Sequence, residues 1–119
     1  MPAYFDCLTR HYVTHVFNYW TEMPPISEQM ALIGSKTNSD LVAARFLIKP
    51  GRKYEEAVQA FEPYEEIQEV NEEARRAGAA LILDGRRNSK QTVFIFVNNR
   101  LEGNALQTIQ EMLEVAGAQ

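Results

Sequence analysis

The sequence of 119 residues contains one cysteine and no long apolar run. A single thiol, Cys7, cannot form a disulfide within the chain, which agrees with a reducing compartment. The longest purely apolar runs, such as residues 93–97, are far shorter than the roughly 20 residues of a membrane-spanning helix. The beginning of the chain also lacks the basic residues and apolar stretch of a signal peptide. We therefore expect a cytoplasmic protein with no membrane partner.

Motifs of nucleotide binding and of common hydrolytic catalysis are also missing. Neither G-x-G-x-x-G, G-x-x-x-x-G-K-[ST] nor the nucleophile motif G-x-S-x-G occurs. The formal net charge is −4, and eight glutamates lie between Glu55 and Glu73. A segment this acidic repels a phosphate backbone, which disfavours nucleic acid as a partner. The sequence thus indicates no cofactor and no class of enzyme.

The composition that is present is that of an ordinary globular protein, with 45% hydrophobic and 24% charged residues. A chain of this length is typical of one domain, and no repeat or long linker divides it, so residues 1–119 are expected to form a single domain. The first 25 residues are rich in aromatic side chains and end at the Pro24-Pro25 pair. We expect this N-terminal segment to pack on the core or on a partner chain.

The N-terminal segment has two competing interpretations. Its apolar residues between Phe5 and Trp20 follow helical spacing, but many are β-branched or aromatic, which favours a strand. In a helix, Cys7, His11 and His15 would stack at four-residue intervals, where they could bind zinc or supply a thiol nucleophile. No acidic base lies inside this motif and no further Cys/His cluster follows. We therefore expect a polar helix face and no metal site.

Beyond Pro25 the apolar pattern predicts further strands and helices. Short apolar runs indicate strands, and apolar residues three and four positions apart indicate helices. Gly78 occupies the position of a helix C-cap, and residues 84–90 are rich in turn-forming side chains, so the flanking apolar runs predict a β-hairpin. The expected elements are a strand at 41–48, a helical region at 54–77 interrupted near Pro63, hairpin strands at 79–83 and 92–97, and a helix at 104–116 capped by Asn104. This order predicts an α+β fold, with an antiparallel sheet of three or four strands and helices on at least one face.

The predicted strand at 92–97 is apolar on both of its faces. Phe94 and Phe96 alternate with Val93, Ile95 and Val97. A strand of this kind normally has both sides covered. The expected helices cover one side, and the N-terminal segment or a second copy of the chain covers the other. Our first functional hypothesis is therefore a non-catalytic binding or regulatory module that self-associates as a homodimer.

Two groups of cations support other hypotheses. One group follows the strand at 41–48 and the other lies in the hairpin loop; they are Lys49, Arg52 and Lys53, and Arg86, Arg87 and Lys90. If the two strands run antiparallel side by side, both groups meet at one end of the sheet as a basic rim, which would attract an anion. The second hypothesis is a binder of a small anion, a nucleotide or single-stranded nucleic acid. The third is a small enzyme or metal protein that uses Cys7, His11 and His15.

Overall fold

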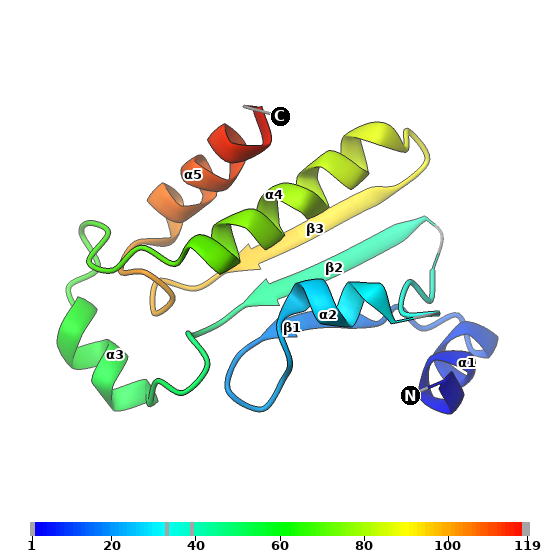
Figure 1. Ribbon diagram of the computed structural model, residues 1–119, viewed down its shortest axis with the longest axis horizontal. Helices are drawn as coiled ribbons and strands as arrows, with labels where there is room; N and C mark the ends of the chain where they lie inside the picture. Colours follow the sequence, from blue (N-terminus) through cyan, green and yellow to red (C-terminus); the bar gives the residue numbers. More distant parts are fainter. Residues whose placement is uncertain (1, 33, 39, 118–119) are drawn as a thin grey trace.

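The computed structural model describes residues 2–32, 34–38 and 40–117. The elements are α1 (Pro2–Arg10), β1 (Val16–Tyr19), α2 (Ile26–Ala31), β2 (Leu41–Phe46), α3 (Tyr54–Phe61), α4 (Glu72–Arg87), β3 (Thr92–Val97) and α5 (Ala105–Gly117). The strands form one sheet in the order β1-β2-β3, and both strand pairs are parallel (Figure 1). The fold is therefore α/β, with helices that alternate with the strands of a three-stranded parallel sheet.

The expected antiparallel sheet is wrong because residues 79–83 belong to a helix. α4 continues through them to Arg87, so β2 and β3 are joined by a helical crossover instead of a hairpin, and a crossover makes the strands parallel. Gly78 does not cap this helix but lies inside it, against the side chain of Met112 in α5. A Cβ atom at position 78 would collide with that side chain. Ala74, Gly78 and Leu81 thus form a helical stripe that the sequence interpretation divided at its glycine.

Other expected elements are confirmed, some with different limits. β2 and β3 lie within the predicted strands, and α3 begins at Tyr54 as predicted. The backbone between α3 and α4 is irregular, so the helix expected there starts only after Asn71, whose side chain accepts a hydrogen bond from the backbone N–H of Ala74. Asn104 caps α5 as predicted, because its side chain accepts from the backbone N–H of Gln107 at 3.0 Å. The N-terminal segment forms both a helix and a strand, α1 and β1.

One face of the sheet forms the core. Phe17, Val42, Ala44 and Phe46 from the three-stranded sheet are buried there with Leu81 of α4 and neighbouring side chains. Figure 1 shows α2 and α4 crossing in front of the strands, and α5 lies beside α4. The N-terminal segment also packs on this side, because the ring of Phe5 contacts that of His15, which contacts Phe17. Among the described residues, none of the helices is long and apolar enough to cross a membrane.

The other face of the sheet is not covered by any described helix. The parallel register places one set of side chains on this face, which we call the open face: Val16, Asn18, Leu41, Ala43, Arg45, Thr92, Phe94 and Phe96. Phe94 and Phe96 are 48% and 58% exposed. β3 has apolar side chains on both faces, but it is an edge strand and one of these faces is exposed, so the expectation of a strand covered on both sides is wrong for the single chain. The N-terminal segment does not cover its second face.

Candidate functional site

The three residues of the predicted thiol and imidazole cluster do not share a helix face. α1 ends at Arg10, so only Cys7 lies on it, and its side chain is exposed. His11 is exposed in the turn that follows, whereas His15 is buried directly before β1. The helical premise of this cluster is wrong. Within the part of the chain that the structure describes, no three His, Cys, Asp or Glu side chains are placed to hold a metal ion.

The predicted basic rim is divided between the two ends of the sheet. Lys49, Arg52 and Lys53 follow the carboxyl end of β2, while Arg86 and Arg87 end α4 and Lys90 lies between α4 and the amino end of β3. Because β2 and β3 are parallel, these two ends are opposite. The expected convergence of six cations is therefore wrong, and any ligand would meet at most one of the two groups.

A pocket of about 380 Å³ lies at the carboxyl ends of all three strands. In open parallel sheets, ligands commonly bind in the crevice beyond these ends. We call this the carboxyl-end pocket. The segments that follow the three strands contribute most of the lining, and the start of α3 with the turn before it contributes the rest; the lining is Trp20, Thr21, Leu47, Ile48, Arg52, Tyr54, Asn98 and Arg100.

Hydrogen bonds hold the segments of the carboxyl-end pocket together. The backbone N–H of Leu47 donates to the carbonyl of Tyr19 at 3.1 Å, which joins the ends of β1 and β2. The N–H of Asn98 donates to the carbonyl of Phe46 at 3.0 Å, which joins the ends of β2 and β3. The hydroxyl of Thr21 accepts from the N–H of Gly51 at 3.1 Å. The pocket is therefore formed by backbone that the sheet positions directly.

Arg52 is a largely buried cation in the wall of this pocket. Its side chain is 15% exposed, forms an ion pair with Glu69 and lies with Cζ 5.0 Å from the centre of the Phe61 ring. Its Nη1 atom is buried and has no hydrogen-bond partner among the described residues. A hydrogen bond from Lys49 and the positive charge of Arg52 lower the pKa of the Glu69 carboxyl. The ionised carboxylate of Glu69 pairs with Arg52, but the Nη1 donor of the guanidinium still lacks an acceptor among the described residues.

Arg100 brings a second guanidinium to the pocket. Its Cζ atom lies 4.5 Å from the centre of the Tyr54 ring, and no described carboxylate pairs with it. The side-chain oxygen of Asn98 accepts a hydrogen bond from the backbone N–H of Arg100. The NH₂ group of the same side chain has no protein partner within the described chain. The arrangement offers donors and positive charge beside two aromatic rings, those of Trp20 and Tyr54.

Sequence reasoning identified Arg52 but missed the other polar residues of the carboxyl-end pocket. Trp20 and Asn98 stand one position after β1 and β3, and Arg100 follows Asn98 by two. Residues directly after strands converge only when the strands are parallel. The incorrect antiparallel prediction therefore concealed this signal. In an antiparallel sheet, the carboxyl ends of neighbouring strands lie at opposite ends of the sheet.

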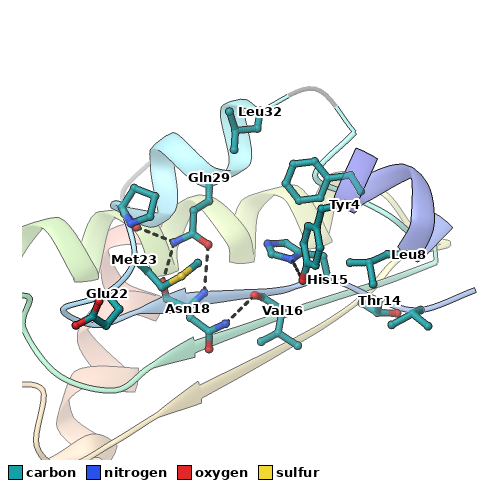
Figure 2. A pocket seen from close by; sticks show the side chains of 13 residues that line it. Tyr4, Leu8, Thr14, His15, Val16, Asn18, Glu22, Met23, Gln29 and Leu32 are labelled. Atoms are coloured by element: carbon teal, nitrogen blue, oxygen red, sulfur yellow. Dashed lines mark hydrogen bonds between the residues drawn. The ribbon is translucent and has the colours of Figure 1, made fainter. Parts of the chain in front are cut away.

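A larger cavity, of about 690 Å³, lies between α1, β1 and α2 (Figure 2). We call it the helix–strand cavity. Most of its lining is apolar, and the polar side chains come mainly from β1 and from the segments beside it; the residues are Tyr4, Phe5, Leu8, Val13, Thr14, His15, Val16, Asn18, Glu22, Met23, Pro24, Gln29 and Leu32. Its size falls in the range of small-molecule sites, about 300–1,000 Å³. Burial lowers the pKa of His15, so its imidazole is neutral at neutral pH.

Comparison of the chain with protein-family models, with curated protein sequences and with solved structures finds no match. The function is therefore argued from these two sites and from the open face.

Proposed function

We propose that this protein is a non-catalytic binding module that takes a small anionic ligand, carrying a phosphate or carboxylate group, in the carboxyl-end pocket. The observation that supports this most directly is the unsatisfied Nη1 of Arg52. A buried donor without a partner costs free energy, and a ligand oxygen in the pocket would supply the missing acceptor.

The surroundings of Arg52 favour an anion over a neutral ligand. Arg100 adds a second positive charge that no described carboxylate neutralises, and the amide of Asn98 adds a donor. Guanidinium groups bind carboxylate and phosphate oxygens through paired, charge-assisted hydrogen bonds. The ring of Trp20 lines the same pocket and offers a flat apolar surface beside the charged groups. Of the six predicted rim cations, the proposal retains Arg52 as a direct ligand.

Replacement of Arg100 by glutamine is expected to weaken the binding of inorganic pyrophosphate by roughly tenfold, the effect of about 1.4 kcal/mol. Trp20 is the single tryptophan of the chain and lines the pocket, so its fluorescence reports binding directly. The titration is done at low ionic strength, because salt screens such an interaction. Arg100 forms no described ion pair, and its removal is expected to change the free energy of unfolding by no more than about 0.5 kcal/mol.

The matched control is Arg86→Gln, which removes the same charge at the amino end of β3. This variant is expected to bind pyrophosphate as the wild type does. Equal weakening by Arg86→Gln and Arg100→Gln would show a general effect of net charge and would overturn the site. A titration in which pyrophosphate changes neither the Trp20 fluorescence nor the melting temperature would overturn anion binding itself.

A second proposal, self-association, is favoured by the open face. Parallel sheets almost always have both faces covered, and here one face leaves Phe94 and Phe96 half exposed. The large rings lie on β3, while β2 and β1 carry the small side chains of Ala43 and Val16 on the same face. Two open faces related by a twofold axis along the strands would place Phe94 of each copy over these small residues of the other and Phe96 at the level of Asn18 and Arg45. We propose that a second copy of the chain covers this face.

Sedimentation velocity at micromolar concentration is expected to show a dimer for the wild type and a monomer for Phe94→Ser/Phe96→Ser. The substitutions remove the two largest apolar side chains of the open face. Leu106→Ser is the control, since Leu106 is an exposed apolar residue of α5 outside this face, and it is expected to remain dimeric. A monomeric wild-type protein, or a double variant that stays dimeric, would contradict the proposal.

A further inference from the structure

The helix–strand cavity differs in chemistry from the carboxyl-end pocket. Its lining contains no lysine or arginine, and its single carboxylate, that of Glu22, lies at one end in an exposed position (Figure 2). Aliphatic and aromatic side chains form the remaining walls, among them Leu8 of α1, Val16 of β1 and Leu32, which directly follows α2. An anion would lose its hydration here without gaining a cation, so the cavity favours an uncharged, largely apolar molecule.

Most polar groups in the cavity wall are already occupied by the protein. The Gln29 side chain accepts from the backbone N–H of Asn18 at 3.3 Å and donates to the carbonyls of Asn18 and Pro24, each at 2.7 Å. The side-chain amide of Asn18 donates to the carbonyl of Val16 at 2.9 Å. Figure 2 shows these bonds along the outer edge of β1. The amide groups therefore stabilise the strand edge and are not available to a ligand.

The polar group that remains inside is the imidazole of His15. This residue is 8% exposed, and the rings of Tyr4, Phe5 and Phe17 pack against it with centroid distances of 4.9 to 5.8 Å. Its Nδ1 lies 3.5 Å from the hydroxyl of Tyr4, a long hydrogen bond, and its Nε2 has no partner among the described residues. Of the two neutral tautomers, the one that carries its proton on Nε2 lets Nδ1 accept from that hydroxyl. His15 then presents one N–H donor in an apolar wall.

We infer that the helix–strand cavity is a binding site for a small, uncharged, largely apolar molecule that carries one hydrogen-bond acceptor, such as a carbonyl or ether oxygen, and that Nε2 of His15 donates to this acceptor. The geometry supports the assignment at three points: a cavity of ligand size, walls without lysine or arginine, and a largely buried imidazole whose Nε2 has no partner among the described residues. The assignment is independent of anion binding in the carboxyl-end pocket, which shares no lining residue with this cavity. Either proposal can fail without the other.

Nile red is a suitable probe, because it is uncharged, has a carbonyl oxygen and becomes fluorescent in apolar surroundings. We expect saturable binding of one molecule per chain. Leu8→Trp, in α1, and Leu32→Trp, directly after α2, each fill part of the cavity from a different side and are expected to weaken binding by roughly tenfold or more. His15→Phe keeps an aromatic ring but removes the donor, and a loss of about fivefold is expected. Circular dichroism of each variant checks that the chain is folded, and two cavity-filling variants keep the test valid if one of them is not.

Two control variants separate this cavity from other apolar surfaces. Leu106→Trp adds the same side chain on α5, and Phe94→Ser removes a ring from the open face. Both are expected to bind Nile red as the wild type does. Loss of binding in Phe94→Ser, or unchanged binding in Leu8→Trp and Leu32→Trp, would place the probe elsewhere and overturn the inference. Unchanged affinity in His15→Phe would overturn the assignment of His15 as the donor.

Discussion

Replacement of Glu102 by alanine is expected to lower the free energy of unfolding by about 3–5 kcal/mol, the cost of breaking a buried ion pair from one side. Glu102 is 0% exposed, and its carboxylate accepts two hydrogen bonds from Arg75, at 2.8 and 3.2 Å. It also accepts from the backbone N–H of Asn71 and from the hydroxyl of Thr108, each at 2.6 Å. The carboxylate thus joins the start of α4, the loop after β3 and α5.

The large loss of stability arises because the substitution leaves buried hydrogen-bond donors without their acceptor. Without the carboxylate, the guanidinium of Arg75 stays buried with only the distant Glu111 as a partner, at 3.5 Å. The backbone N–H of Asn71 loses the same acceptor, whereas the hydroxyl of Thr108 keeps the carbonyl of Asn104 at 3.0 Å. Each buried donor without a partner adds its own desolvation cost, about 1–3 kcal/mol.

Urea denaturation followed by circular dichroism measures this change, and Glu111→Ala is the control. Both variants remove a carboxylate that pairs with Arg75, but the Glu111 side chain is 41% exposed. Exposed pairs contribute about 0–1 kcal/mol, so the control is expected to stay close to the wild type. Similar small losses in both variants would mean that solvent reaches Arg75 and that the network is not a buried one.

The sequence pattern correctly predicted β2 and β3, whose apolar runs are bounded by turn-forming residues. It failed at Gly78, because a glycine can either end a helix or lie inside one. The run from Leu41 is bounded by Pro50-Gly51, and the run from Thr92 follows a turn-rich segment, so both were identified as strands. Residues 79–83 are a short apolar run after Gly78, and periodicity cannot tell such a run from a buried helix segment. The decisive fact is the contact between Gly78 and Met112, which lies 34 positions away along the chain.

The candidate sites could not be predicted in full from the sequence, because they depend on the parallel order of the strands and on contacts between distant elements. Arg52 was identified from its charge, but its burial and its unsatisfied nitrogen depend on Phe61 and Glu69, which no local pattern places beside it. The helix–strand cavity could not be predicted at all, because its walls come from three elements. His15 was noted for its spacing from other potential ligands, whereas its position in the structure depends on packing against aromatic rings.

Replacement of Gly103 by alanine is expected to lower the free energy of unfolding by about 3 kcal/mol or more, because two separate costs combine. Gly103 is buried and has φ of +122°, a backbone conformation that residues with a side chain rarely adopt. A Cβ atom there would also lie 2.6 Å from the carbonyl oxygen of Glu66 and 2.9 Å from the backbone nitrogen of Gln68. Backbone cannot move aside as a flexible side chain can, so the segment before α4 must shift. That shift would weaken the hydrogen bond from the N–H of Gln68 to the carbonyl of Glu102, now 2.8 Å long.

Gly51→Ala separates the two costs, because Gly51 has φ of +90° but an added Cβ atom there would meet nothing within 4 Å. Only the conformational cost remains at this position, and we expect a loss of about 1–2 kcal/mol. Urea denaturation of both variants under the same conditions gives the comparison. Since Gly51 lies in an exposed turn and Gly103 contacts backbone on a neighbouring segment, the difference between the two losses measures the steric part. Equal losses would show that the segment around Glu66 yields to an added methyl group and is not packed tightly against the loop after β3.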